Sequence, residues 1–337
     1  MCVTIVQTSV QTLSGHSKGL RVARLILETW SVMDNRYFPL EVVAVMLALG
    51  LTLTVADFRR AATMRRPLAV ALICQTTLLP ALCLLIAETL NLPGNLAVGL
   101  MLMAATPGGL TANILSHLFN GDLALNLTLT AINAVLSIVA LPAILAFSMT
   151  WFLGEGRFIP LQVDKFFAVF GLVLIPTAVG VAVRHRLPEL ARRLQRPVRI
   201  AAAVLLVVIA AAAIGGAWKT LWHNIGVLSG AVISLCAVSL TVGYLAPRWM
   251  RLAPRQAIAM SLEIGMHNGV VAMGVALSPQ LLDNAEMAIP AAVYGVIAPF
   301  VALSFIFAVR RLDPSHRNSG PSRMPPDDLP APFNDAR

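Results

Sequence analysis

Nine stretches of about 20 largely apolar residues restrict the fold of this chain more than any other feature. A helix needs about 20 such residues to cross the hydrocarbon core of a bilayer. The stretches do not alternate with period two, so they predict membrane helices rather than the strands of a barrel. The predicted spans are residues 37–56, 67–89, 96–118, 123–153, 163–183, 200–218, 224–246, 256–278 and 287–309.

The composition agrees with an all-α polytopic membrane protein. Of the 337 residues, 58% are hydrophobic and only 12% are charged, which is about half the charged fraction of soluble domains. This excludes an ordinary soluble enzyme, a disordered protein and a nucleic-acid-binding protein, despite the net charge of +9. The four cysteines are too few for a disulfide framework, and three of them lie inside apolar runs, where packing explains them.

The basic residues divide the loops into two sets. Eighteen of them follow spans one, five, seven and nine, whereas the opposite loops hold only Arg157, Lys165 and Lys219. The positive-inside rule therefore predicts an outside N-terminus and a cytoplasmic C-terminus in the inner, or plasma, membrane. The arginine clusters are assigned to this topological signal, with some contact to anionic lipid.

The two ends of the chain fall outside this pattern. Residues 1–36 carry four basic residues on the predicted outer side and have no signal-peptide core. We favour an extension upstream of a natural start at Met33, with an interfacial helix over about 19–32 and a transit peptide as alternatives. Residues 311–337 are rich in Pro, Ser and Asp and predict a disordered tail. The membrane domain is then 37–310.

One carboxylate lies well inside a predicted span. Glu263 belongs to the segment SLEIGMHNG, residues 261–269, and His267 follows four residues later on the same helix face. The two glycines of this segment allow unwinding, or else form a helix-packing surface. Packing does not explain a carboxylate, an imidazole and the Asn268 amide within six residues. Polar groups at this depth are costly, so we expect them to be functional.

The third span is interrupted near its middle by TPGGLTAN, residues 106–113. Proline lacks an N–H group and glycine relaxes the backbone, so a helix break is predicted rather than a simple kink. A break exposes carbonyl groups at the end of one half-helix and N–H groups at the start of the next. Such ends bind cations and anions, respectively.

Amides and hydroxyls in two further spans add oxygen atoms to the bilayer interior. Four of them follow spacings of four, three and four and so share one face of the fourth span: Asn126, Thr130, Asn133 and Ser137. Gln75 lies in the second span. Each alone is explained by hydrogen bonding between helices. Together with Glu263 they supply the neutral oxygens and the single negative charge that a hard monovalent cation prefers.

The two interrupted spans, the third and the eighth, occupy equivalent places in two groups of four. The groups begin on opposite sides of the predicted membrane. This is the pattern of an inverted repeat, with two discontinuous helices crossing at the midplane. It predicts a secondary transporter.

On these residues the chain resembles the bile acid:sodium symporter family over most of residues 38–310. The matching segments are residues 50–58 (GLTLTVADF), 75–80, 107–113 and 263–268. The resemblance implies inverted five-helix repeats that form a panel domain and a core domain. The panel would comprise helices 37–56, 163–183 and 200–218, and the core 67–153 and 224–309. The chain would lack the first panel helix, in agreement with nine spans.

The same resemblance implies two sodium sites that share Glu263. The first would use Asn113, Asn126, Thr130 and Glu263, and the second Gln75, Glu263, the backbone of Ile264 and Met266, and the side chain of His267. A substrate would lie near Asn268 and the helix N-terminus at Leu110 and Thr111. A helix N-terminus favours an anion.

Three positions depart from the family pattern: Ala112, His267, and Asn126, where a serine is usual. Ala112 stands where a serine is common and removes an oxygen ligand, which Asn126 could restore. His267 stands where a glutamine is common, and imidazole is a poor sodium ligand that titrates near neutrality. The expected function is sodium-coupled symport of an organic anion, either bile-acid-like or a small carboxylate or sulfonate. The alternatives are proton coupling through Glu263 and His267, or an uncoupled uniporter.

No enzymatic activity is expected, because the spans contain neither a His-Glu-x-x-His nor a Gly-x-Ser-x-Gly motif. The expected partners are the organic anion and the lipid bilayer, with no nucleic acid. The sequence indicates neither the substrate nor the oligomeric state.

Overall fold

The computed structural model describes residues 63–154, 163–278 and 281–312, together with single positions between 43 and 59. Within these ranges the chain is almost entirely helical, which confirms the all-α prediction for this part. Most of the predicted span 37–56 lies outside the described residues. The same holds for the interpretations placed on residues 1–36 and for the tail beyond Leu312.

Most helices begin and end within a few residues of the predicted spans, but the helix predicted at 200–218 begins twelve residues earlier, at Pro188. Arginines placed in the loop before it therefore lie in the helix. They are α5 (Arg65–Ile73), the π-helical turn η1 (Cys74–Leu78), α6 (Leu79–Thr89), α7 (Gly94–Ala105), α8 (Leu110–Leu118), α9 (Leu123–Leu153), α10 (Val163–Arg186), α11 (Pro188–Gly216), α12 (Trp218–Trp249), α13 (Pro254–Gly265), α14 (Gly269–Leu277) and α15 (Ala285–Leu312). The third and eighth predicted spans each consist of two half-helices, α7 with α8 and α13 with α14.

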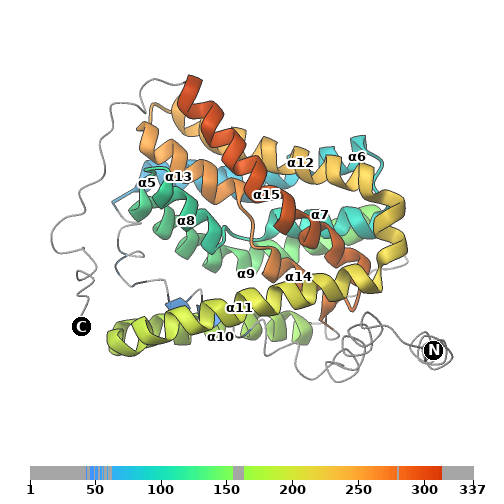
Figure 1. Cartoon of the computed structure of the whole chain (residues 1–337), viewed down its shortest axis with the longest axis horizontal. Helices are drawn as coiled ribbons and strands as arrows, with labels where there is room; N and C mark the ends of the chain where they lie inside the picture. The colour runs from blue at the N-terminus through green and yellow to red at the C-terminus, as the bar shows by residue number, and fades with distance from the viewer. Residues whose placement is uncertain are drawn as a thin grey trace, which may run out of the picture.

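The broken helices occupy the middle of the bundle (Figure 1). Helix α12 packs against α13 and α15, and α7 packs against α9 and α15. Helices α10 and α11 pack against each other and run along one side of the molecule (Figure 1). Every residue of α7 from Leu96 to Ala105 is buried, so the first broken helix is enclosed by its neighbours.

The surface of the described helices has the apolar character of a membrane protein. Three segments are long and apolar enough to cross a membrane alone: Arg65–Thr89, Trp218–Trp249 and Ala285–Leu312. The two parts of α9, bent by 55°, add a fourth span if they are counted together. Ile73, Val139 and Phe300 are each more than 60% exposed, as contact with lipid allows. These features support a multi-pass membrane protein.

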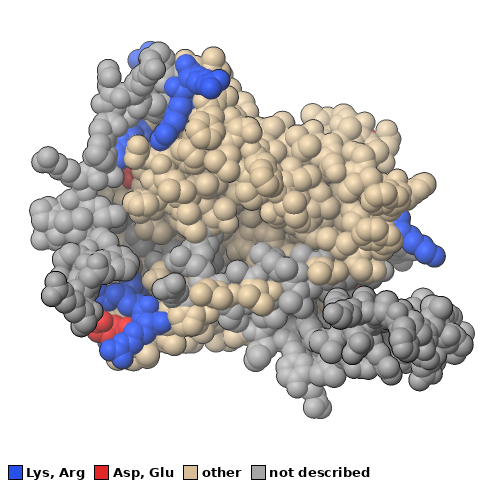
Figure 2. All heavy atoms as spheres, viewed as in Figure 1, with Lys and Arg blue, Asp and Glu red and all other residues tan. Residues whose placement is uncertain are grey.

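Basic residues gather at one end of the molecule. Figure 2 shows Lys and Arg mainly at the end of α15 and near the α10–α11 junction, with neutral atoms over most of the visible middle. The last turns of α10 and α15 carry Arg184, Arg186, Arg310 and Arg311. This distribution agrees with one arginine-rich side, and the cytoplasmic identity of that side stays a prediction.

The sequence explains where each break falls. Helix α7 ends at Ala105 because Thr106 turns to an extended conformation (φ −79°, ψ 145°) directly before Pro107, as residues before proline tend to do. Helix α14 begins after Asn268, whose side-chain oxygen accepts a hydrogen bond from the Val271 N–H (3.3 Å). An asparagine in this position is a strong start signal for a helix.

Candidate functional site

The two helix breaks meet and pair through their backbones. The Gly109 N–H donates to the Met266 carbonyl (3.1 Å), and the Asn268 N–H donates to the Pro107 carbonyl (3.0 Å). Gly108 and His267 form an antiparallel bridge between these bonds. Unwound backbone inside a membrane must find such partners. The pairing therefore fixes the two discontinuous helices to each other at their centres.

Glu263 lies beside this pairing and is fully buried. The Thr130 hydroxyl lies 2.7 Å from Oε2 and donates to it, and the Asn133 amide donates to Oε1 over 3.4 Å. A Cβ atom added to Gly108 would lie 2.4 to 2.5 Å from the carboxylate atoms, so the carboxylate packs directly on the first break. Both side-chain donors are neutral. A buried negative charge with neutral donors is costly and favours a cation as its partner.

The residues predicted for the first cation site form one hydrogen-bonded cluster. The Asn126 amide donates to Asn113 Oδ1 (2.8 Å), and the Asn113 amide donates to the Thr130 hydroxyl (3.5 Å). Thr130 in turn contacts Glu263. The buried Asn126 Oδ1 has no hydrogen-bond partner in the described part of the chain. The cluster thus offers a carboxylate, a hydroxyl and an unused amide oxygen.

The residues predicted for the second site are less closely associated. Gln75 donates its amide hydrogens to the carbonyls of Thr106 (3.1 Å) and Ala104 (3.5 Å), and so ties η1 to the end of α7. The Met266 carbonyl accepts the Gly109 N–H. Ile264 is buried beside Glu263 in α13.

His267 packs by its ring rather than by its nitrogens. Its ring centroid lies 5.4 Å from that of Tyr294. Neither ring nitrogen meets a hydrogen-bond partner among the residues that the structure describes.

The predicted substrate residues lie at the starts of the two second half-helices. Leu110 is the first residue of α8, Thr111 is exposed in its first turn, and Asn268 precedes α14. The side-chain oxygen of Asn268 is used by the Val271 N–H. Two helix N-termini therefore begin beside the backbone pairing, and the positive end of a helix dipole suits an anion.

Two residues of the site belong to neither of the sodium sites that the resemblance implies. Asn133 was placed on the polar face of the fourth span, and its spacing was the signal that could have identified it as a Glu263 partner. Tyr294 on α15 gave no such signal. Its hydroxyl donates to the Gly265 carbonyl at the end of α13 and accepts the His267 N–H (3.5 Å). It thereby holds both sides of the second break.

The Tyr294→Phe variant should be destabilised without losing its fold. The change leaves the His267 N–H without its partner and leaves the Gly265 carbonyl with only the weak thiol donor of Cys236 (3.8 Å), at a cost of about 1 to 3 kcal/mol. We expect a fall of several degrees in the melting temperature of the detergent-purified protein. Ser239→Ala is the control, because this buried hydroxyl donates only to carbonyls of its own helix, Leu235 and Cys236. Equal melting temperatures for the two variants would contradict this role of Tyr294.

Comparison with known proteins identifies relatives of this chain. It is 29% identical over 268 residues to the "Probable sodium/metabolite cotransporter BASS2, chloroplastic" of Oryza sativa subsp. japonica, covering 79% of this chain and 61% of the relative. It is 25% identical over 272 residues to the "Uncharacterized sodium-dependent transporter YocS" of Bacillus subtilis (strain 168), covering 80% and 81%. A human "Sodium-dependent organic anion transporter" is 28% identical over 207 residues, covering 60% and 54%.

These relatives are named as transporters and not as enzymes. The chain spans about three-fifths of the length of the rice relative, so part of that protein has no counterpart in the match. The model of the Sodium Bile acid symporter family matches residues 39–224, more than half of the chain and including Gln75 and the first helix break. The resemblance seen in the sequence is confirmed by this match, and the chain belongs to the sodium bile acid symporter family.

Proposed function

We propose that this protein is a sodium-coupled secondary transporter that carries a small organic anion, a carboxylate or sulfonate, across a membrane. The observation that carries the proposal is the fully buried Glu263 carboxylate, held by neutral donors where two helix breaks meet. Such a charge is stabilised when a cation binds and costly when none does. The names of the three relatives above refer to sodium, which favours sodium as that cation.

The residues of the cluster fit sodium by their chemistry. Sodium is a hard cation, and hard cations prefer carboxylate, carbonyl, amide and hydroxyl oxygens. Glu263, Thr130, Asn113 and Asn126 supply these oxygens, and the unpartnered Asn126 Oδ1 is free to turn toward an ion. This amide oxygen offsets the ligand lost at Ala112. A second sodium would use Gln75, the carbonyls near Ile264 and Met266, and the region of His267. Proton coupling through Glu263 and His267 has no support from the relatives and is not part of the proposal.

Sodium binding and anion binding are coupled through the breaks in this proposal. A cation at Glu263 neutralises the charge beside Gly108 and stabilises the pairing of residues 107–109 with 266–268. That pairing sets the positions of the N-termini of α8 and α14. The anion then binds at these N-termini, near Leu110, Thr111 and Asn268, where its charge is favoured.

The membrane arrangement proposed is the one the sequence predicts. Nine spans would form a panel, with α10 and α11, and a core, with the broken helices and α9, α12 and α15. The core and panel would move against each other to expose the site to either side. The N-terminus would be outside and the C-terminus cytoplasmic in a plasma membrane.

The test is the melting temperature of the purified full-length protein in rising sodium chloride, with choline chloride at equal ionic strength as the control. Ligand at 100 times its dissociation constant stabilises a protein by about 2.7 kcal/mol. We therefore expect sodium to raise the melting temperature by roughly 5 °C or more. Equal curves in sodium and choline would overturn sodium coupling. In that case the missing oxygen at Ala112 would favour an uncoupled uniporter.

A further inference from the structure

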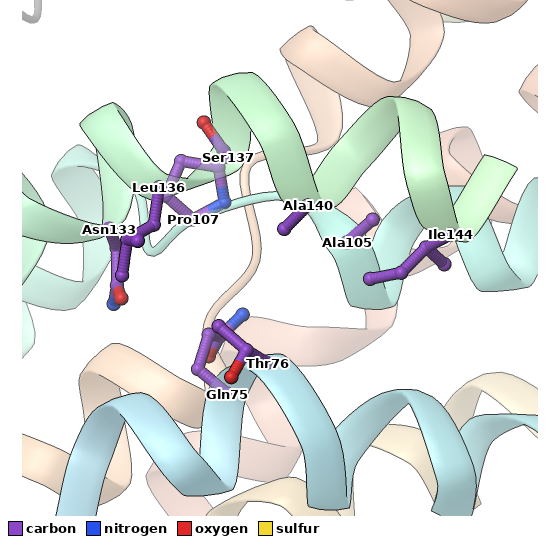
Figure 3. Close-up of a pocket in the computed structure, with 9 residues that line it drawn as sticks. All are labelled: Gln75, Thr76, Ala105, Pro107, Asn133, Leu136, Ser137, Ala140 and Ile144. Carbon is purple, nitrogen blue, oxygen red and sulfur yellow. The ribbon is translucent and has the colours of Figure 1, made fainter. Parts of the chain in front are cut away.

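A small pocket lies next to the crossing of the broken helices, between η1, the break after α7, and α9 (Figure 3). Its empty space, counted with its mouth, is about 250 Å³, and its interior has room for about one water-sized particle. Its polar lining consists of four side chains: Gln75, Thr76, Asn133 and Ser137. The rest of the wall is apolar and includes Pro107, Ala140 and Ile144.

The four polar side chains of the pocket each donate a hydrogen bond to another group of the protein. Gln75 donates to the carbonyls of Thr106 and Ala104, and Asn133 donates to Glu263. The hydroxyls donate to backbone carbonyls of their own helices. These bonds are Thr76 to Leu72 (2.8 Å) and Ser137 to Ala134 (2.8 Å).

The pocket consequently presents oxygen lone pairs. Gln75 Oε1 and Asn133 Oδ1 are both buried and have no partner in the described part of the chain. The two amides approach the pocket from opposite walls, η1 and α9 (Figure 3). The orientation of each amide follows from its partners, since carbonyl and carboxylate oxygens only accept. Pro107 contributes no N–H group to the wall. A lining of this kind favours a cation over an anion.

Asn133 connects this pocket to Glu263. Its amide nitrogen contacts the carboxylate, whereas its oxygen has no partner in the described part of the chain, and the side chain lines the pocket. A cation in the pocket would therefore be one side chain away from the buried charge. The pocket contains no carboxylate of its own, so it suits a transient position better than a high-affinity site.

We propose that this pocket is the access route by which the coupling cation reaches Glu263, with the four oxygens replacing water that the ion sheds on the way. The inference rests on the sodium coupling proposed above. It assigns a role to Thr76 and Ser137, which belong to neither predicted sodium site, and makes Asn133 the last contact before Glu263.

The test uses the double variant Thr76→Val, Ser137→Ala. It measures both the rates of sodium binding and release and the equilibrium affinity for sodium. Loss of two oxygens on a route raises the barrier for entering and leaving equally. We expect sodium association and dissociation, followed by stopped-flow tryptophan fluorescence, to slow about tenfold. The sodium midpoint of the melting curve should not change. The matched control is Ser148→Ala, whose buried hydroxyl on the same helix makes a similar bond to Leu145 (2.9 Å) away from the pocket.

The outcomes separate this inference from the proposed function. No sodium response in the unaltered protein would overturn sodium coupling itself. Suppose that sodium raises the melting temperature of the unaltered protein and that Glu263→Gln abolishes this rise. Unchanged rates of sodium association and dissociation in the double variant would then overturn only the access route. A raised sodium midpoint with an unslowed dissociation rate would also overturn it, because the two hydroxyls would then belong to the equilibrium site.

A second measurement does not depend on removing hydroxyls. Ala140→Cys places a thiol on the pocket wall with a small change of volume. A cationic methanethiosulfonate reagent should modify this thiol at least tenfold faster than an anionic one, and sodium should slow the reaction. The unaltered protein is the control for reaction at its four native cysteines, of which Cys74, Cys83 and Cys236 are buried. Equal rates with the two reagents would contradict a cation-selective pocket.

Discussion

Replacing Glu263 with glutamine is expected to abolish the sodium-dependent rise in melting temperature and to reduce sodium-driven anion uptake to background. Glutamine keeps the size of the side chain but removes the negative charge to which Thr130 and Asn133 donate. Removing one partner of a buried ion pair costs about 3 to 5 kcal/mol, which corresponds to a loss of at least 100-fold in sodium affinity. The measurements are melting in sodium and choline, and uptake into proteoliposomes.

A second expectation concerns the Glu263→Gln variant in the absence of sodium. Without sodium, the unaltered chain holds a buried carboxylate that only neutral groups stabilise. Glu263→Gln removes that cost, so its melting temperature in choline should equal or exceed that of the unaltered protein. A variant that is simply misfolded would melt lower in both salts. The two readouts together therefore distinguish loss of the ion from loss of the fold.

Glu286→Gln is the matched control. This carboxylate, at the start of α15, accepts hydrogen bonds from Asn95 (2.6 Å) and Thr220 (2.7 Å). Its loss should lower stability by about 1 to 3 kcal/mol and leave the sodium response intact. A sodium response that persists in Glu263→Gln, or disappears equally in Glu286→Gln, contradicts the assignment of the site.

The helix breaks could be predicted because their signals are local. Pro107 and the two glycines after it end a helix wherever they occur, and the structure ends α7 at Ala105 and starts α8 at Leu110. The face shared by Asn126, Thr130 and Asn133 was predictable for the same reason, since helical spacing alone determines it. All three are buried in the structure.

The contacts across the chain could not be predicted from residue patterns. Thr130 and Glu263 are 133 residues apart; the residue pattern marked both as candidate cation ligands, but only the resemblance to a family put them in one defined sodium site. Gln75 is an example of a contact that the residue pattern does not predict. Its amide hydrogens bind the carbonyls released at the end of α7, a pairing that depends on how η1 lies against the break. The π-helical turn that positions Gln75 had no signal beyond the nearby Pro80, whose missing N–H disturbs regular bonding.

Gly108→Ala should damage the cation site while leaving the fold nearly unchanged. The added Cβ would lie 2.4 to 2.5 Å from the Glu263 carboxyl carbon and oxygens, far inside van der Waals contact. The carboxylate is the end of a flexible side chain, so it can turn away at small cost to folding. In doing so it leaves Thr130 and Asn133, and the oxygens of the cluster no longer converge. We expect the sodium midpoint of the melting curve to rise at least tenfold, about 1.4 kcal/mol.

Gly109→Ala controls for every effect except the clash. At this neighbouring residue the added Cβ would meet nothing closer than 3.8 Å, and the backbone (φ −106°, ψ −179°) is one that alanine adopts freely. Both substitutions reduce the freedom of the unfolded chain by the same amount. A normal sodium midpoint in Gly109→Ala and a raised one in Gly108→Ala would place the ion against the first break. Equal midpoints in the two variants would mean that sodium binds away from the contact between Gly108 and Glu263. The proposed mechanism would then fail, because it couples the ion to the broken helices through this contact.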